Sequence, residues 1–516
     1  MTQQEAQTPG PPGLPVLGSA LTIGRMGALP FFESCWRQYG DAYRVRVGGQ
    51  RWIVLAHPDA VHHVLIGARK RFIKGAAYDP IRLLGGDGII FKEGPTWLRD
   101  RKLMQPSFHQ RSIARLMTRM VEDTGQAIER MRRFGGEPFD FHHEMVRLSM
   151  QIAGNTLFGM DLSEEASLNA PAMAKALELI SERGNSAAPI PMSVPTPSNV
   201  RLRRAIGHFD EMVYEIIARA RAHASPERDD TLLAMLLTTR DEDTGVGLSD
   251  RELRDQIVNL VIAGHETTAL LMTWTWAFLA KLPDIRERVI EEVDRVLGDR
   301  PPRLEDLPAL TLTKQVLQES MRLRPPLWAV ARNCIEDDVI GGHHVPAGTL
   351  VIMPSYLTHR HPGFWDHPER FEPERFSAEA SAGRHKCAYF PFSTGPRICL
   401  GDTFAMVEGQ LILAMLLQQC RGALVGDGKI IPDARISLRP KGPVMVRSQW
   451  RDEQPVTSAP EQKQSSPLVR PLRWINKMGA TLAGRGIRVP NLSEESLIAT
   501  ARQKTGLEDL GDEAFR

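Results

Sequence analysis

Apolar residues recur every three or four positions along much of the chain, which is the spacing of amphipathic α-helices. Residues 111–160 and 201–240 show it, and the longest such run extends from Ser249 to about Leu282. Ser249-Asp-Arg-Glu252 has the sequence of a capping box and marks the start of that run. At 1.5 Å per residue the helix would be about 50 Å long, so it must cross the whole domain.

Alternation of period two, which predicts strands, is confined to short segments. Tyr43–Val47 and Trp52–Ala56 alternate on either side of Gly48-Gly49 and predict a hairpin. Helical spacing precedes and follows this hairpin, at Phe31–Tyr39 and Pro58–Ile66. Further short strands are expected between residues 323 and 370, so the pattern predicts a mainly α fold with small β-sheets.

Two stretches break the helical pattern and predict loops. Residues 74–95 are rich in glycine and predict a long loop, which in a compact domain is often functional. Asn185–Asn199 is rich in proline and serine and predicts a surface flap, because such a sequence does not continue a helix. The apolar residues of the first loop are Ile81, Leu83, Leu84, Ile89 and Ile90.

Composition excludes several classes of function. The 516 residues are 42% hydrophobic and 24% charged, as in an ordinary globular protein, and the net charge of +2 argues against nucleic-acid binding. The five cysteines include no C-x-x-C pair, so we expect no disulfide framework or zinc cluster and infer a reducing compartment. His359, His361 and His367 lie close together, but the Pro, Gly and Asp residues around them predict a solvated loop and not a metal site.

The amino-terminal region lacks the pattern of a signal peptide or a membrane span. Ala20–Phe32 is partly apolar, but Arg25 and Pro30 interrupt it well short of the ~20 apolar residues that a span needs. We therefore expect no membrane anchor.

One cysteine, Cys399, is set in a sequence that suggests chemistry. It follows a loop containing Gly395 and Pro396, and an apolar helical run from Phe404 to Leu417 comes directly after it. The positive end of that helix would stabilise a thiolate. A buried structural cysteine would account for Cys399 but not for the Phe, Gly, Arg and Gly residues at fixed offsets from it.

These offsets form the pattern F-x-x-G-x-R-x-C-x-G, from Phe392 through Arg397 and Cys399 to Gly401. The stretch resembles the haem-thiolate loop of the cytochrome P450 family and matches every fixed position. The resemblance implies a helical prism around a buried haem b, with a long central helix. It also implies that Cys399 is the axial thiolate ligand of the iron.

The long central run carries a second motif, Ala263-Gly-His-Glu-Thr-Thr268. Glycine and β-branched threonines weaken a helix interior, and an acid and two hydroxyls in an apolar stretch need partners. A helix kink with a back-bonded threonine is one explanation. The motif also resembles the oxygen-binding groove of the same family, which implies that Ala263 and Gly264 leave room for O2. Thr267, with Glu266 beside it, would then deliver protons.

Three further residues match positions that bind the haem propionates in this family. Trp97 and Arg101 lie one helical turn apart, which is most often an ordinary surface pair, but they fit the family pattern W-x-x-x-R. Arg332 falls where the family places another propionate partner. The resemblance implies that these three residues and Arg397 neutralise the propionates.

Glu319-Ser-Met-Arg322 carries the family's E-x-x-R spacing, which has little weight alone because it recurs elsewhere in the chain. Its position before Leu323-Arg-Pro-Pro326, together with Arg375 downstream, resembles the family's Glu-Arg-Arg triad. We interpret this triad as structural and haem-assembling and not as catalytic.

The resemblance covers about residues 9–450, so we predict a haem domain over 1–450. The composition of residues 451–467 is that of a linker. Residues 468–516, with a helix expected from Ser493, weakly resemble the start of a bacterial sulfotransferase-like family. A truncated second domain and a disordered tail both remain open.

The function that the resemblance implies is a monooxygenase that hydroxylates an apolar substrate such as a fatty acid, terpenoid or steroid. No flavin or nicotinamide motif occurs, so O2 chemistry would draw two electrons from a separate ferredoxin or flavodoxin and its reductase. Basic residues on the docking face would be Arg99, Lys102, Arg384 and Lys386. As for bacterial members, we expect a cytoplasmic monomer. A haem-thiolate isomerase or peroxygenase, a haem gas sensor and a fusion enzyme remain as alternatives.

Overall fold

The fold was taken from a computed structural model, which describes residues 8–159, 190–223, 231–240 and 245–452 together with Leu179 and Arg183. Contacts divide the chain into two units, Met1–Glu453 and Gln454–Arg516. Apart from Arg451 and Asp452, which pair with Asp294 and Arg132, the predicted linker and carboxy-terminal helix lie outside the described residues.

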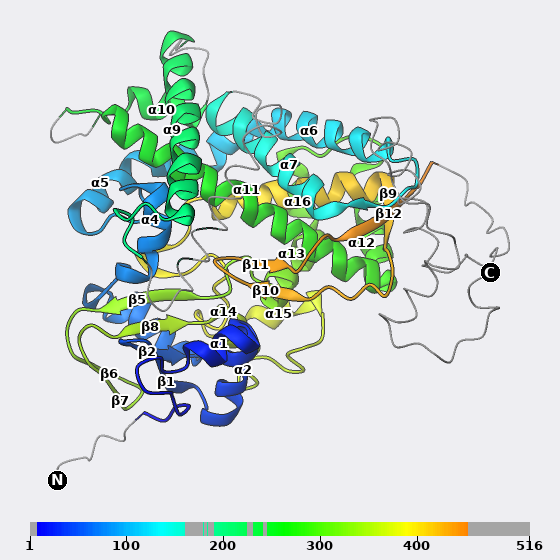
Figure 1. The fold of residues 1–516 in the computed structure, drawn as a ribbon. Coiled ribbons are helices and arrows are strands. Elements are labelled where there is room, and N and C mark those ends of the chain that lie inside the picture. Colours follow the sequence, from blue (N-terminus) through cyan, green and yellow to red (C-terminus); the bar gives the residue numbers. More distant parts are fainter. Residues whose placement is uncertain are drawn as a thin grey trace, which may run out of the picture. The chain divides into compact units, whose positions relative to one another are not determined.

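Helices dominate the described part of the chain (Figure 1). Their bounds are α1 (Ala20–Met26), α2 (Ala28–Tyr39), α3 (Pro58–His62), α4 (Asp79–Gly85), α5 (Gly94–Met104), α6 (Gln110–Arg132), α7 (Phe141–Ala153), α9 (Pro197–His223), α10 (Leu232–Thr238), α11 (Asp250–Lys281), α12 (Pro283–Leu297), α13 (Thr311–Leu323), α14 (Ser355–Thr358), α15 (Ala378–Ser381) and α16 (Asp402–Gln419). Among them, none is long and apolar enough to cross a bilayer.

The long central helix is confirmed as α11, which has 32 residues. The capping box is also confirmed: the Ser249 hydroxyl accepts from the Glu252 N–H, and the Glu252 carboxylate accepts from the Ser249 N–H. α11 packs against α7, α9, α13 and α16 (Figure 1). The large apolar core forms among these helices, so the middle of α11 is held by neighbours on several sides.

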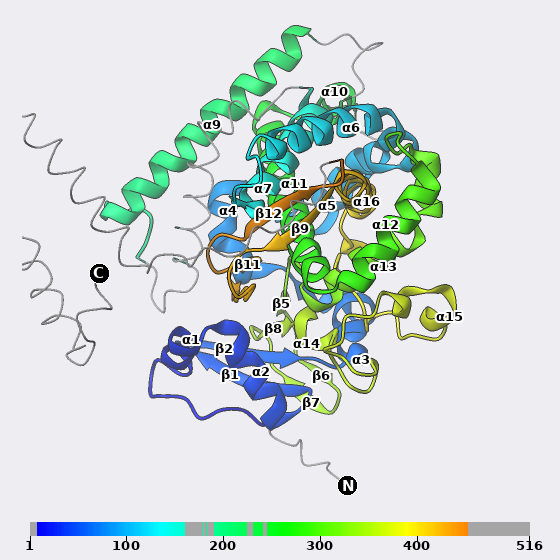
Figure 2. The ribbon, with the colours of Figure 1, turned by 90° about the vertical axis from the view of Figure 1, so that its right-hand side faces the viewer.

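Strands form small sheets beside the helices. Their bounds are β1 (Ala42–Val47), β2 (Gln50–Leu55), β3 (Phe72–Ile73), β4 (Phe139–Asp140), β5 (Val330–Cys334), β6 (Asp338–Ile340), β7 (His343–Val345), β8 (Leu350–Met353), β9 (Cys420–Leu424), β10 (Pro432–Ala434), β11 (Leu438–Pro440) and β12 (Met445–Trp450). The five-stranded sheet has the order β1-β2-β8-β5-β3, and only β2 and β8 pair in parallel. Figure 2 shows β1 and β2 with α1 and α2 at the opposite end from α6. The predicted hairpin is thus confirmed as β1 and β2.

The expectation of one long loop over residues 74–95 is wrong, because α4 occupies its centre and α5 begins at Gly94. Pro80 lies in the first turn of α4, where a missing N–H costs nothing, and Leu84 is fully buried. The glycines serve close packing of this segment on α11. A Cβ at Gly86 would overlap the Asp255 carboxylate, and φ is +58° there.

The flap predicted at Asn185–Asn199 lies partly outside the described residues. Ile190 to Thr196 are described and precede α9, which begins at Pro197. The solvated histidine loop is wrong in one respect: His359 is fully buried, and its Nε2 accepts from the Phe390 N–H at 2.9 Å.

Candidate active site

The Cys399 loop is held by backbone geometry. A 3₁₀ turn at Gly395–Arg397 precedes the cysteine, whose N–H donates to the Phe392 carbonyl at 2.9 Å, and α16 begins directly after Gly401. Gly395 has φ of +74°, and a Cβ there would lie 2.5 Å from the Leu65 carbonyl oxygen. Only glycine fits that position, so the turn that presents the thiol depends on it.

Cys399 differs from the other four cysteines, all of which are buried, because its side chain is exposed. Protein atoms nevertheless surround it on most sides, and this burial raises the pKa of the thiol above its ordinary value. The Gly401 N–H and the nearby cations Arg101 and Lys74 act in the opposite direction. A thiol that solvent can reach inside such a loop has the geometry of a ligand and not of a core cysteine.

α11 borders open space at one point in its middle. Ala263 is exposed, although almost every neighbouring residue from Leu253 to Leu279 is buried or half-buried. A Cβ on Gly264 would meet only the Ala153 side chain, at 3.9 Å, so the packing does not require glycine there. Thr267 donates its hydroxyl to the Ala263 carbonyl at 2.6 Å, and α11 continues through this point without interruption. The motif therefore leaves open space beside the Thr267 hydroxyl, which is fixed by its hydrogen bond to the Ala263 carbonyl.

Glu266 turns toward β11 and its neighbours. Its carboxylate accepts from the Ser437 hydroxyl at 2.9 Å and pairs with Arg439. Burial acts to raise the pKa of Glu266, but Arg439 and the two hydrogen bonds outweigh it and hold the pKa below its usual value. Glu266 is therefore ionised at neutral pH.

The residues expected to bind propionates gather around the Cys399 loop. Arg101 donates to the Ile398 carbonyl at 2.8 Å, and the Arg397 guanidinium lies over the Trp97 ring, 4.4 Å from its centroid. Arg332 is almost fully buried. Both guanidinium groups are partly buried, and this burial lowers the pKa of Arg101 and of Arg397.

Lys74 joins this cluster and is not among the residues predicted from the sequence. Its ammonium donates to a backbone carbonyl and lies 5.3 Å from the centroid of the Tyr78 ring, whose hydroxyl accepts from Arg332 at 3.3 Å. Burial, together with the charges of Arg332 and Arg397, lowers the pKa of Lys74 to about 7. Glu93 is the carboxylate that pairs with Arg397. The cluster thus holds more positive than negative charge.

The Glu319, Arg322 and Arg375 side chains meet, as the triad predicts. Arg322 donates to both carboxylate oxygens of Glu319, at 2.7 and 2.8 Å, and both side chains are fully buried. Arg375 lies 3.5 Å from the same carboxylate, which also accepts from the Glu372 N–H at 2.8 Å. The remaining N–H groups of Arg322 donate to backbone carbonyls, so this network is closed within the protein.

A second acid, Glu408, connects α16 to α11 and was detectable as a single acid in the apolar run from Phe404 to Leu417. It is almost completely buried, and it accepts from the Thr268 hydroxyl at 3.2 Å. Its other oxygen has no hydrogen-bond partner among the described residues. Burial raises the pKa of Glu408 to about 8, so the carboxyl group is neutral at pH 7.

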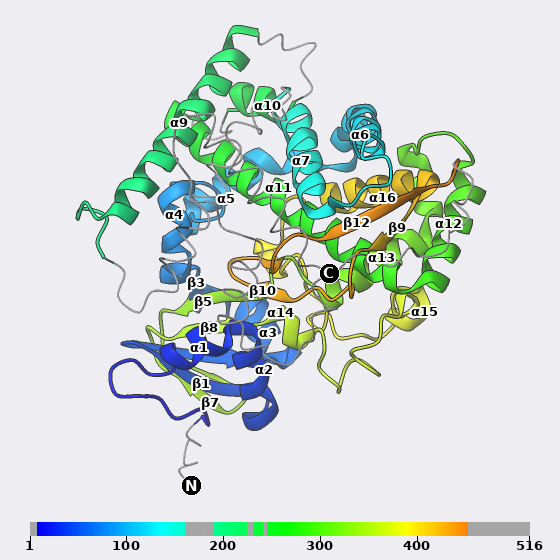
Figure 3. The ribbon, with the colours of Figure 1, turned by 45° about the vertical axis from the view of Figure 1, so that its right-hand side comes forward.

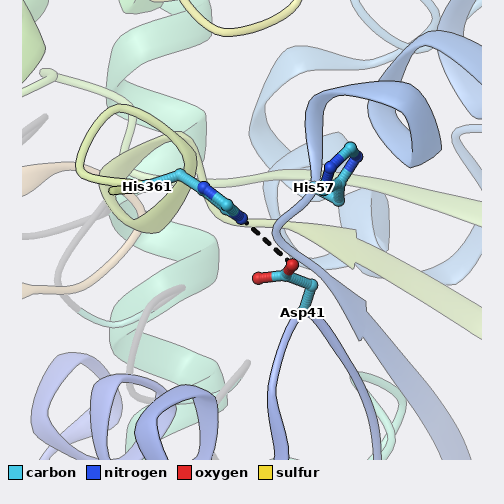
Figure 4. A group of neighbouring side chains, drawn as sticks. All are labelled: Asp41, His57 and His361. Carbon is cyan, nitrogen blue, oxygen red and sulfur yellow. Dashed lines mark hydrogen bonds and ion pairs between the residues drawn. The ribbon is translucent and has the colours of Figure 1, made fainter. Parts of the chain in front are cut away.

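Asp41, His57 and His361 form the one group in the described residues with metal-ligand spacing (Figure 4). His361 Nε2 bonds to Asp41 at 3.0 Å. Nδ1 of His361 accepts from the Gly363 N–H, and Nδ1 of His57 accepts from the Asp59 N–H. Neutral imidazoles with Nδ1 so occupied carry their proton on Nε2 and have no free lone pair. The hydrogen bond from His361 to Asp41 joins the segment after α14 to the residue before β1.

The residues around Cys399 fit a haem. An accessible thiol can bind iron, and a cluster with surplus cations suits the two carboxylates that a haem carries. The exposed Ala263 leaves room for a small ligand at the middle of α11.

Comparison with known proteins decides the family. The family model described as Cytochrome P450 matches residues 8–446. The chain belongs to the cytochrome P450 family. The fold and the haem cofactor expected from the sequence are thereby confirmed, and the P450 is an oxidoreductase of the monooxygenase type.

Proteins that resemble this P450 in sequence or in structure include further members of the family. It is 32% identical to cyclooctatin synthase of Streptomyces melanosporofaciens over 85% of its own length and 94% of that protein. It is 31% identical to pentalenene oxygenase of Streptomyces avermitilis, over 82% and 93% respectively. A crystal structure of the cytochrome P450DA haem domain superposes with a TM-score of 0.79 at 26% identity, covering 86% of this chain and 98% of that one.

Proposed function

We propose that this P450 hydroxylates a cyclic, apolar substrate of the terpenoid class with O2 and two electrons from a separate carrier. The main observation that supports this proposal is the exposed Cys399 thiol, which lies among more cations than carboxylates. The terpenoid class, chosen over fatty acids and steroids, is supported by two relatives, pentalenene oxygenase and a cyclooctat-9-en-7-ol 5-monooxygenase to which the chain is 33% identical.

Cys399 would hold the haem iron as its thiolate, and Arg101, Arg332, Arg397 and Lys74 would hold the carboxylates, with the Trp97 indole as a further donor. Phe392 and Gly401 frame the Cys399 loop on either side. When bound, a thiolate-ligated haem supplies oxygen activation and insertion into a C–H bond. The protein positions the substrate and keeps water away.

Thr267 is proposed to manage the proton. Its hydroxyl already donates to the Ala263 carbonyl, which leaves its oxygen lone pairs free to accept a proton donor in the space beside Ala263 and Gly264. A small shift of that hydroxyl would let it donate into the same space. The hydroxyl therefore sits where a proton can be held and passed on.

Glu266 is less suited than Thr267 to pass on a proton. Its partner Arg439 keeps it ionised, so at neutral pH it has no proton to give. We keep it as the predicted second catalytic residue and expect its contribution to depend on that ion pair. Two variants separate proton delivery by Glu266 from its ion pair with Arg439. If Glu266 delivers protons, Glu266→Gln should lower product per electron more than Arg439→Gln does.

Electron delivery is proposed to come from a ferredoxin or flavodoxin, as expected from the sequence, with this chain acting as a monomer. Of the four basic residues considered, Lys102 and Lys386 are exposed. Arg99 pairs with Glu252, and Arg384 lies over the Trp365 ring, so neither is a free surface charge. Lys102 and Lys386 therefore form the docking face proposed here.

The domain boundaries and the cytoplasmic location also remain proposals. A haem domain over 1–450 is supported by the family match to residue 446 and by the division of contacts after Glu453.

The function is tested by titrating the purified haem protein with pentalenene, a fatty acid and a steroid and following the haem spin-state change. We expect the terpenoid to bind and, with a carrier, to be hydroxylated.

Thr267→Ala should bind equally but release peroxide, with product per electron lower by roughly tenfold. Cys399→Ser should lose the red-shifted band with CO, whereas Cys387→Ser, a buried cysteine, should keep it. Binding of the fatty acid or steroid alone would refute the substrate class.

A further inference from the structure

The residues between α4 and α5 are fixed to α11 through their backbone, and we call residues 86–93 the connecting segment. Three of its N–H groups donate to side chains in the amino-terminal half of α11: Asp87 to Asp255 at 2.9 Å, Ile89 to Gln256 at 2.9 Å and Ile90 to Asn259 at 3.0 Å. Figure 3 shows α4 and α5 beside this half of α11. The path of the connecting segment is therefore set by a helix far from it in sequence.

The far end of the connecting segment holds two cations of the Cys399 cluster. Arg397 donates to the Lys92 carbonyl at 2.9 Å and pairs with the Glu93 carboxylate. The same carboxylate accepts from the Lys74 N–H at 2.8 Å, and the Lys74 ammonium donates to the Ile90 carbonyl. The positions of Lys92 and Glu93 therefore decide where the Arg397 guanidinium lies.

Asp100 on α5 anchors this end of the segment from a buried position. It is 1% exposed, and one of its carboxylate oxygens accepts from the Lys92 ammonium at 2.7 Å and from the Gln256 side-chain amide at 2.6 Å. Its other oxygen has no hydrogen-bond partner among the described residues. Because the Gln256 amide oxygen already accepts from the Ile89 N–H, its NH2 group is the one that faces Asp100. Asp100 and Gln256 thus link α5, α11 and the connecting segment.

Asp100 is the closest counter-charge of Lys92. The Lys92 side chain is 13% exposed, and the next carboxylate, Glu252, lies 3.8 Å from its ammonium. A buried ion pair contributes little net stability compared with apolar residues of similar size, so stability alone does not explain this one. The pair ties the Lys92 side chain to α5 one helical turn after Trp97, whose ring lies against Arg397. α5 therefore touches Arg397 directly through Trp97 and indirectly through Asp100 and Lys92.

We propose that Asp100 is a positioning residue for the haem: through Lys92 it fixes the backbone that holds Arg397, and so places the guanidinium for a haem carboxylate. This inference rests on the proposed role of Arg397. A direct effect of the Asp100 charge would have the opposite sign, because a buried negative charge repels the carboxylates of the haem. Removing that charge would then slow haem loss, whereas loss of positioning makes haem loss faster.

The test measures haem loss to apomyoglobin from the full-length haem protein. Asp100→Asn keeps the size of the side chain and removes the counter-charge of Lys92. We expect haem loss to be about tenfold faster in Asp100→Asn and in Arg397→Gln. The double variant should lose haem no more than about twofold faster than Arg397→Gln alone, since both changes act through one guanidinium. The red-shifted band with CO should stay in the haem that remains, because Cys399 is untouched.

Lys92→Met removes the same contact from the other side. Asp100 can then take up a proton and need not remain as a buried charge, so this variant should fold. It should also lose haem about tenfold faster than wild type and add no more than about twofold to the loss in Arg397→Gln.

Asp255→Asn is the matched control. Asp255 is also a buried carboxylate bound to the connecting segment, but it holds the Asp87 N–H at the other end. This variant should be destabilised in urea like Asp100→Asn and still retain haem like wild type. Unchanged or slower haem loss in Asp100→Asn, additive loss with Arg397→Gln, or equal loss in the control would each overturn the inference. Unchanged haem loss in Arg397→Gln would refute the proposed role of Arg397 and this inference with it.

Discussion

Two clusters of arginines in this P450 differ in how their charge is balanced. Around Glu319, every N–H group of Arg322 has an acceptor, and Arg375 and a backbone N–H complete the carboxylate. Around Cys399, Arg397 pairs with Glu93, and Arg101, Arg332 and Lys74 lie close by; burial lowers the pKa of Lys74 to about 7. Both clusters are poorly hydrated, but only in the first do the central pair, Glu319 and Arg322, satisfy each other and their remaining hydrogen bonds within the protein.

The difference separates structure from function. A buried charge network whose groups are paired with one another has no free donors or acceptors for a ligand, so its role is to hold segments of the chain together. A cluster with uncompensated charge costs stability in the folded protein until an anion arrives. Substitutions in the two clusters should therefore have effects of opposite sign on the protein without its cofactor.

The largest effect is expected from breaking the closed network. Glu319→Gln leaves Arg322 buried without its counter-charge, which should cost about 3–5 kcal/mol of a total stability of about 5–15 kcal/mol. We expect little folded, haem-loaded protein, measured by the CO spectrum per unit of protein and by thermal unfolding. Glu372→Gln is the control, because Glu372 is 39% exposed in its side chain and pairs only at the edge of the network. Equal behaviour of the two variants would show that the network is not what holds these segments.

A smaller effect, of opposite sign, is expected from Lys74→Met. Removing one of four crowded cations should stabilise the cofactor-free protein and weaken haem retention by roughly tenfold, since the carboxylates lose one charged partner. Haem transfer to apomyoglobin measures retention, and urea unfolding of the cofactor-free protein measures stability. Lower stability of the cofactor-free variant in urea, together with an unchanged rate of haem loss, would contradict an excess of positive charge in this cluster.

The same variant has a pH signature. Unfolded chain keeps Lys74 protonated up to its ordinary pKa of 10.5, whereas the folded protein releases that proton above about pH 7. The unfolded state therefore binds more protons between these values, so wild-type cofactor-free stability gains a contribution as pH rises from 7, at most about 1.4 kcal/mol per unit. Lys74→Met should lack this rise.

The smallest effect is expected at Glu408, which lies in neither cluster and carries no charge at neutral pH. Its raised pKa means that the folded state binds more protons between pH 4.5 and about 8, so stability should fall as pH rises through that window. Glu408→Gln should keep the bond from Thr268 and remove the fall, so the two proteins should diverge with increasing pH. Parallel stability curves from pH 5 to 8 would show that Glu408 does not titrate there.

Local patterns in the sequence predicted much of this molecule. The capping box at Ser249, the hairpin around Gly48 and the order of the family motifs correspond to what the structure contains, because each depends on neighbours in sequence. The role of Lys74 was not predictable in this way, since its partners Arg332 and Arg397 come from distant segments. The sequence does not predict α4, because Gly85, Gly86 and Gly88 at and after its end are typical of a loop, whereas in the fold they allow close packing on α11.

The parallel pairing of β2 with β8 has a consequence for how the chain is made. Trp52 lies opposite Leu350, and Val446 of β12 lies opposite Phe139 of β4. Partners about 300 positions apart leave a ribosome roughly 15–60 s apart at the usual synthesis rates. During that interval β2, rich in apolar residues, has an unpaired edge, which is a template for aggregation. Overproduction of this enzyme should therefore be limited by chaperone capacity, and a lower rate of initiation, which leaves fewer unpaired edges present at one time, should raise the folded yield.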